Sequence, residues 1–269
     1  STGATTSFLT GQCFGVYSAT VTDSRGCKAN ATTTVLAAPD ITVTINNTNP
    51  NCFGQCTGVA TAAVSGGSPT YTINWTNGDV GTISSALCQG NYTATVTDSK
   101  GCIKTETVDI IAPPALTLTP TNGTTTCAGT CDGTVSVNVT GGTPGYFYSW
   151  NSIPAQTTAT ATSLCAGNYI VNVTDGRGCI GSAGATVTQP VVLTASIVGV
   201  QPSCNVCIGS ATTTGVGGTG PYTYNWTPGT PTGDGTVSVT GLTPGVWTCT
   251  VTDNMGCSTT RDFTITQPT

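Results

Sequence analysis

Apolar and polar residues alternate along short stretches of this chain, and glycine, proline, asparagine and aspartate separate one stretch from the next. In residues 133–142, GTVSVNVTGG, the apolar positions are Val135, Val137 and Val139. Successive side chains of a β-strand point to opposite faces, so this period of two predicts strands with one face in a core. Residues 168–174, NYIVNVT, show the same alternation. The pattern therefore predicts an all-β protein.

A motif that reads as a strand followed by a tight turn occurs four times, as VYSATVTDSRGC, NYTATVTDSKGC, NYIVNVTDGRGC and VWTCTVTDNMGC. Its aspartates, of which Asp23 is the first, follow one another at steps of 75, 77 and 78 residues. A fixed period of this size indicates an array of similar domains. We expect Asp98, Asp175 and Asp253 to begin the turns and to cap them through side-chain hydrogen bonds.

Aromatic residues keep the same period, because YTINW, YFYSW and YTYNW each follow a Gly-Gly turn. We predict that their tryptophans lie in domain cores, together with the aromatic residues of the repeated motif. The predicted core residues are Trp75, Trp150, Trp226, Tyr92, Tyr169 and Trp247. The predicted domains are the second half of a repeat over residues 1–39 and whole repeats over residues 40–115, 116–191 and 192–269.

Each whole repeat contains six or seven short predicted strands with turn signals at regular intervals, which is typical of an immunoglobulin-like antiparallel β-sandwich. Short linkers that contain proline separate the repeats. Proline fixes φ and blocks continued strand pairing, so these joints are expected to be stiff. The fold prediction is therefore a tandem array of immunoglobulin-like β-sandwiches that forms an elongated rod.

Composition excludes several functions. The chain has only six Lys and Arg residues and a net charge of −5, which argues against nucleic-acid binding because phosphate neutralisation needs basic side chains. No apolar run reaches the roughly 18–20 residues of a membrane span. Without histidine, a Ser-His-Asp arrangement cannot form. We therefore predict a protein that is not an enzyme and has no cofactor. A calcium site at the loop aspartates Asp79, Asp132 and Asp234 is the one metal hypothesis.

Fourteen cysteines occur in the chain. Their even number, their periodic positions and the absence of histidine favour disulfides over a zinc site. Disulfides place the protein outside the cell, where they persist, and each adds a few kcal/mol to a small domain with a thin core. The candidate cysteines are Cys13, Cys27, Cys52, Cys56, Cys88, Cys102, Cys127, Cys131, Cys165, Cys179, Cys204, Cys207, Cys249 and Cys257.

The expected pairs follow from the strand order of an immunoglobulin-like sandwich, in which the loops before the second and sixth strands lie at the same end. This favours Cys56–Cys88 and Cys131–Cys165. In the last repeat, Cys207 is expected to pair with Cys249. Two alternatives remain open for Cys52: a bond to Cys102 within its own repeat, or a bond to Cys179 of the next repeat.

The sequence resembles the SprB-type repeat of large cell-surface proteins of Bacteroidota. The residues that carry the resemblance are CTGVATAAVSGGSPTYTINW with GNYTATVTDSKGC, and the closing VTQP and TITQP; the pattern covers essentially the whole chain. The resemblance implies an extracellular, filamentous protein at the cell surface, and the best-known protein of this kind is a mobile adhesin of gliding motility that the type IX system exports.

Three functional hypotheses result. The first is a stalk or filament segment of a repeat adhesin, stiffened by disulfides and proline joints, whose partners are neighbouring repeats of the same long chain. The second is a glycan- or surface-binding module that contacts surface polysaccharide through exposed aromatic residues. The third is a subunit of an extracellular fibre of identical chains, in which strand exchange completes the half repeat. Because the first repeat begins at its midpoint, we expect a longer chain.

Overall fold

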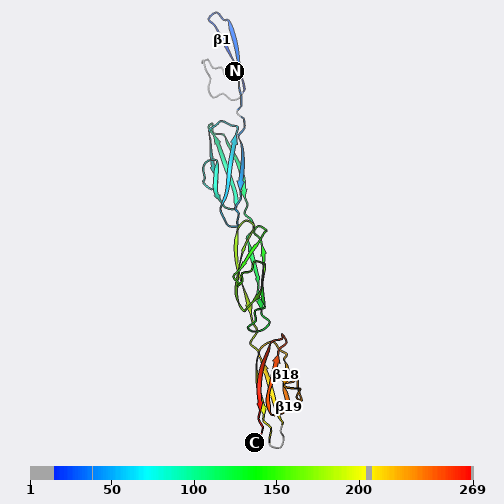
Figure 1. Ribbon diagram of the computed structural model, residues 1–269. Coiled ribbons are helices and arrows are strands. Elements are labelled where there is room, and N and C mark those ends of the chain that lie inside the picture. Colours follow the sequence, from blue (N-terminus) through cyan, green and yellow to red (C-terminus); the bar gives the residue numbers. More distant parts are fainter. Residues whose placement is uncertain (1–14, 38, 204–207, 268–269) are drawn as a thin grey trace. The chain divides into compact units, whose positions relative to one another are not determined.

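The computed structural model describes residues 15–37, 39–203 and 208–267 (Figure 1). Every regular element in these ranges is a β-strand, which confirms the predicted all-β architecture. None of the described ranges contains a helix that is long and apolar enough to cross a membrane. The chain divides into two compact units, Ser1–Pro113 and Pro114–Thr269.

The N-terminal unit contains a hairpin and a sandwich. The hairpin pairs β1 (Gly15–Thr22) with β2 (Lys28–Val35), antiparallel. The sandwich has two antiparallel sheets of three strands. In the first, the order is β3 (Thr42–Thr48), β4 (Gly58–Ser65) and β6 (Ile83–Leu87). In the second, the order is β5 (Tyr71–Trp75), β7 (Gly90–Asp98) and β8 (Ile103–Ile110).

The C-terminal unit contains two further pairs of sheets, whose strand orders follow the first sandwich except that the short β10 (Gly123–Thr124) adds a strand parallel to β15 (Ile180–Thr188). One pair consists of β9 (Thr117–Thr121), β11 (Gly133–Thr140) and β13 (Thr160–Leu164), facing β10 (Gly123–Thr124), β12 (Phe147–Trp150), β14 (Gly167–Thr174) and β15 (Ile180–Thr188). The other consists of β16 (Thr194–Val200), β17 (Gly209–Val216) and β19 (Ser238–Leu242), facing β18 (Thr223–Thr227), β20 (Gly245–Thr252) and β21 (Ser258–Ile265).

One core fills each pair of sheets, and each core is built from the inward positions of the alternating strands. Trp75, Trp150 and Trp226 are 4%, 2% and 0% exposed, and Trp247 is 8% exposed. Tyr92 and Tyr169 are half-buried against the first two cores. The hydroxyls of these tyrosines donate to the carbonyls of Cys88 and Cys165. All six aromatic residues that the sequence singles out therefore contact core residues.

Candidate functional site at the joint end of each repeat

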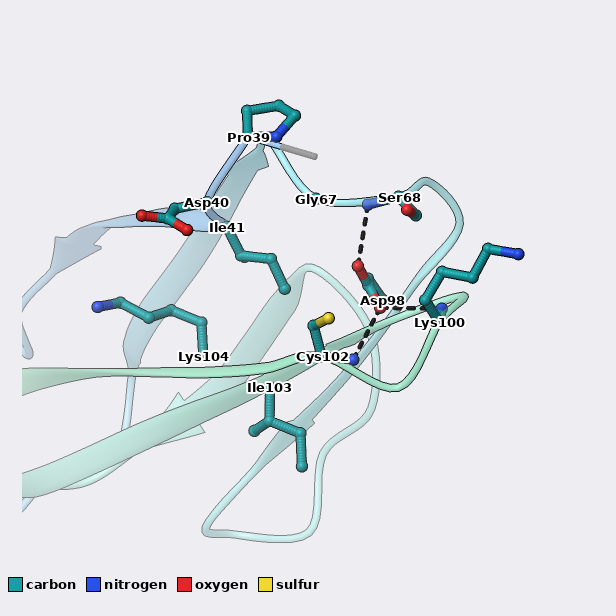
Figure 2. Close-up of a pocket in the computed structure, with 10 residues that line it drawn as sticks. All are labelled: Pro39, Asp40, Ile41, Gly67, Ser68, Asp98, Lys100, Cys102, Ile103 and Lys104. Carbon is teal, nitrogen blue, oxygen red and sulfur yellow. Dashed lines mark hydrogen bonds between the residues drawn. The ribbon is translucent and has the colours of Figure 1, made fainter. Parts of the chain in front are cut away.

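A network of hydrogen bonds ties the last hairpin of a repeat to the linker that enters the repeat. We call this region the joint end; in the first sandwich it comprises Pro39, Gly67, Ser68, Asp98 and Cys102 (Figure 2). The Oδ1 atom of Asp98 accepts from the backbone N–H groups of Lys100 and Cys102, at 2.9 and 2.8 Å. Its Oδ2 atom accepts from the N–H of Ser68 at 2.9 Å.

The Gly-Gly turn connects this carboxylate to the linker. The N–H of Gly67 donates to the carbonyl of Pro39 at 2.7 Å, while the next residue, Ser68, is held by Asp98. The hydroxyl of Tyr71 donates to the carbonyl of Gly66 at 2.5 Å. One buried aspartate thus fixes the hairpin, the turn and, through the turn, the entering linker.

The same network recurs in the two sandwiches of the C-terminal unit. Asp175 accepts from the N–H of Thr143 at 2.8 Å, and the N–H of Gly142 donates to the carbonyl of Pro114 at 2.9 Å. In the last sandwich, Asp253 accepts from the N–H of Thr219 at 2.8 Å. There the linker carbonyl is that of Val191, which accepts from Gly218 at 2.8 Å.

These contacts require glycine in the turn. Gly67 has a φ of +62°, a conformation that side chains with a Cβ rarely adopt. A Cβ at this position would also lie 3.0 Å from Oδ2 of Asp98, and a Cβ at Gly218 would lie 2.4 Å from Oδ2 of Asp253. The glycine therefore permits both the turn and the close approach of the carboxylate.

Hydrogen bonding favours the charged form of these aspartates. The N–H of Ser68 lowers the pKa of Asp98 below its usual value, against the opposing effect of desolvation. Thr219 acts in the same way on the pKa of Asp253. At Asp175, desolvation opposes the shift most strongly, but the backbone donors and the charge of Arg177 still leave the pKa lowered.

Two disulfides close within single sandwiches. Cys56 is bonded to Cys88, 32 residues along the chain, and Cys131 is bonded to Cys165, 34 residues along the chain. Cys88 precedes β7 while Asp98 ends it. The sulfur link and the aspartate network therefore hold opposite ends of the same strand.

A third disulfide joins the two sandwiches of the C-terminal unit. Cys127, in the loop before β11, is bonded to Cys257, at the start of β21; the two residues are 130 positions apart, with a Cα–Cα distance of 5.7 Å. Cys257 follows Asp253 by four residues, and its N–H donates to Oδ1 of that aspartate at 2.9 Å. The joint end of one repeat is thus covalently bonded to the repeat before it.

The loop that carries Cys127 is fixed by its own hydrogen bonds. The N–H of Thr125 donates to the carbonyl of Thr188 at 2.9 Å, and the N–H of Gly129 donates to Oε1 of Gln189 at the same distance. Asp132 accepts from the N–H of Thr126 at 3.0 Å. Hydrogen bonds from Thr126 and then Thr130 lower the pKa of Asp132 to about 2.

The remaining cysteines correct two sequence-based expectations. Cys102 is a free, exposed thiol, so the alternative Cys52–Cys102 bond is wrong; the β3–β4 loop and the β7–β8 hairpin lie at opposite ends of the sandwich. Cys52 and Cys179 are each in a disulfide. The expected Cys207–Cys249 bond is also wrong.

Cys249 is a free thiol on β20, opposite Trp226 in the register, and it is fully buried in the last core. Burial raises the pKa of this thiol. Its side chain points inward at mid-strand, so it packs as a small apolar group rather than reaching a loop. Cys27 is a further free, exposed thiol. Three candidates, Cys13, Cys204 and Cys207, lie outside the described residues.

The aspartates of the calcium hypothesis lie in three separate sandwiches. Asp79 accepts from the hydroxyl of Ser84 at 2.7 Å, Asp132 holds the loop of Cys127, and Asp234 accepts from the N–H of Trp226 at 2.9 Å. Throughout the part of the chain that the structure describes, no three His, Cys, Asp or Glu side chains lie close enough together to hold a metal ion. Calcium binding stays a prediction.

Sequence reasoning expected the turn-capping role of the aspartates but missed their bond to the Gly-Gly turn. The sequence carried a signal for this bond, because the second glycine of each Gly-Gly pair stands 31 to 35 residues before the aspartate.

A pocket of about 370 Å³ lies at the joint end of the first sandwich, between Pro39, Ile41, Ser68, Asp98 and Cys102 (Figure 2).

Comparison with known proteins bears on the first halves of two repeats. Residues 44–80 and 117–154 match the family model described as SprB repeat. These stretches run from β3 into the loop after β5 and from β9 to the loop after β12. A search of curated proteins found no match.

Among solved structures, the chain is similar to a chain of the complex of Dpr2 Ig1-Ig2 with DIP-Theta Ig1-Ig3, with 11% identity over 86% of this chain and 99% of that chain, and a TM-score of 0.31. It is also similar to Drosophila OTK extracellular domains 3–5, with 11% identity, coverage of 86% and 93%, and a TM-score of 0.28. For the N-terminal eight Ig domains of DSCAM, the identity is 10%, the coverage 94% and 51%, and the TM-score 0.28. The chain therefore contains two segments that match the SprB repeat, residues 44–80 and 117–154.

Proposed function

We propose that the chain is a load-bearing stalk segment of an extracellular repeat adhesin. The SprB repeats and the disulfide-rich β-sandwiches support an extracellular, adhesin-like repeat module. The observation that carries the mechanical role is the Cys127–Cys257 bond. Export by the type IX system and gliding motility stay predictions.

The bond changes the path of tension through the C-terminal unit. Force that enters at Pro114 follows the chain to Cys127, crosses the disulfide to Cys257, and leaves along β21. Residues 128–256 lie outside this path, although they include most of both sandwiches. Pulling on the chain therefore loads β9, β10 and β21, but not the other strands of the two sandwiches.

The joint-end network supports the same role. Because each aspartate ties the hairpin to the turn, and the turn is tied to the linker, the linker enters every sandwich through hydrogen bonds to rigid backbone. Backbone groups held by a charged acceptor form the stronger kind of hydrogen bond. These hydrogen bonds therefore stiffen the joints independently of the conformational restriction by proline.

The glycan-binding alternative has less support. Stacking on a sugar ring requires an exposed aromatic face. All four tryptophans of the chain are at most 8% exposed, and the exposed Phe53 and Phe147 lie in different sandwiches. The tryptophans contact the domain cores instead. The stalk hypothesis needs the tryptophans in this buried position.

Single-molecule pulling between the chain ends tests the proposal. Reduction exposes the hidden residues to tension, and 130 residues at about 3.5 Å each add at most about 450 Å of extension. The oxidised chain is expected to lack this length. An oxidised chain that extends as far as the reduced one would overturn the proposal.

A nested bond provides the control. Residues 131–165 lie inside the larger loop, so replacing Cys131→Ser and Cys165→Ser should leave the extension of the C-terminal unit unchanged in the oxidised chain. Replacing Cys127→Ser and Cys257→Ser should increase it. If both double variants extend equally, the Cys127–Cys257 bond does not carry the load.

A further inference from the structure

The first hairpin exposes a face that forms the core in every other repeat. Val21 on β1 is 69% exposed. Its equivalents in the three later copies of the motif are fully buried: Val96, Val173 and Val251. In the part of the chain that the structure describes, β1 pairs only with β2. The hairpin is therefore equivalent to the second half of a sandwich, but its core positions Ala19 and Val21 are exposed.

The first complete sandwich shows what covers this face. β5 lies beside β7 with Trp75 opposite Ala94, and Ala94 is fully buried. The sheet of β3, β4 and β6 closes the core from the other side. Ala19 is the equivalent of Ala94 and is exposed. The missing cover is thus a set of strands like those in the first half of a repeat.

A second observation points to the same partner. Cys102 borders the pocket at the joint end of the first sandwich and is a free, exposed thiol (Figure 2). Its equivalent in the last sandwich, Cys257, is bonded to Cys127 of the repeat before it. Cys179, the equivalent in the middle sandwich, is also in a disulfide. Cys102 therefore occupies a position whose equivalents in both later sandwiches form disulfides, yet it has no cysteine partner among the described residues.

We propose that the open face of β1 and β2 binds the first-half strands of another repeat of this kind, and that the cysteine loop of those strands forms a disulfide with Cys102. The partner's tryptophan strand lies beside β1, as β5 lies beside β7, with its tryptophan opposite Ala19. Its loop enters the pocket between Pro39 and Cys102, as the loop of Cys127 reaches Cys257.

The bond forms by thiol–disulfide exchange. The oxidant is a disulfide donor. The thiols of Cys102 and of the partner's cysteine lose two electrons and two protons as their S–S bond forms, and these reduce the donor's disulfide to two thiols. This inference depends on the disulfide pattern and the exposed hairpin, and not on the load-bearing role. A failure of the pulling experiment would leave it intact.

An extended chain tests the proposal. Asp23 and Asp175 are equivalent and 152 residues apart, which aligns Ser1 with Ile153. A second copy of residues 116–152 placed directly before Ser1 therefore adds first-half strands in register with the hairpin, with their own copy of Cys127. After oxidation, peptide mapping is expected to find the added Cys127 bonded to Cys102, and maleimide labelling of Cys102 is expected to be lost.

Cys27 is the internal control. It stands four residues after Asp23, as Cys102 does after Asp98, but the added segment brings no partner for it. Its labelling is expected to persist. Continued labelling of Cys102, a disulfide-linked dimer through Cys102, or a bond between the added cysteine and Cys27 would each overturn the proposal.

A variant separates strand binding from disulfide formation. With Cys127→Ser in the added copy, Cys102 should stay reactive, while the amides of β1 should become as protected against hydrogen exchange as we expect for β7, which is paired on both sides. If β1 exchanges as fast in this variant as in the unextended chain, the face does not bind first-half strands.

Discussion

Replacing Gly141 by alanine should loosen the joint end of the middle sandwich. Gly141 has a φ of +72°, and a Cβ there would lie 1.8 Å from the carbonyl oxygen of Ala115 in the entering linker. Gly178, in the hairpin of the same sandwich, has a φ of +84° and nothing within 4 Å of the Cβ position. Gly178→Ala is therefore a matched control that adds backbone strain without a clash.

The two costs can be estimated separately. The left-handed conformation costs an alanine roughly 1–2 kcal/mol, which is the whole expectation for Gly178→Ala. At Gly141, the linker must also move away by more than an ångström, which breaks the bond from Gly142 to Pro114. Leaving such groups unpaired costs a further 1–3 kcal/mol or so. We expect roughly 2–5 kcal/mol for Gly141→Ala, against about 4–11 kcal/mol for a whole repeat of this size.

Fluorine NMR with 5-fluorotryptophan reports on each sandwich, because Trp150 is the one tryptophan of the middle sandwich. Urea titration of its signal, assigned with a Trp150→Phe variant, gives the free energy of unfolding. With a slope of about 1–3 kcal/mol per molar urea, the additional 1–3 kcal/mol or so should lower the midpoint by about 0.3–3 M more for Gly141→Ala than for Gly178→Ala. Equal shifts would refute the claim that the linker's close approach to the turn requires glycine.

Three further predictions concern the protonation of Asp132, the Cys131–Cys165 disulfide and the buried Trp226. Asp132 contributes stability above its ordinary pKa of 3.8 that is lost as the pH falls toward about 2; urea midpoints of the wild type and Asp132→Asn should differ near about pH 5 and converge near about pH 2. Replacing Cys131→Ser with Cys165→Ser opens a loop closed over 34 residues and should cost about 4 kcal/mol, measured by urea unfolding; a loss below about 1 kcal/mol would contradict it. Trp226→Ala removes a fully buried side chain and should destabilise the last sandwich by about 3–5 kcal/mol, followed through the remaining Trp247 signal; an unchanged midpoint would show that the core does not depend on it.

Local patterns were sufficient to predict the strands and the resemblance to the SprB repeat that residues 44–80 and 117–154 match. The alternation of Val135, Val137 and Val139 identifies an inward face because a strand has a period of two, whatever lies beside it. The repeated aspartate motif and the tryptophans mark equivalent positions because they recur at the period of the repeat. The expectation of Cys56–Cys88 needed one more assumption, the strand order of the sandwich, and the structure pairs these residues.

The joint end depends on contacts between residues that are far apart in the chain. Asp98 accepts from Ser68, 30 residues away, and Cys127 reaches Cys257 across two sandwiches. Two alternatives for Cys52 fitted the sequence equally well, because spacing does not say which end of a sandwich a loop occupies. Cys249 looked like a displaced bridge cysteine, yet its inward direction on β20 places it in the core. Packing in three dimensions selects among pairings that the linear order leaves equivalent.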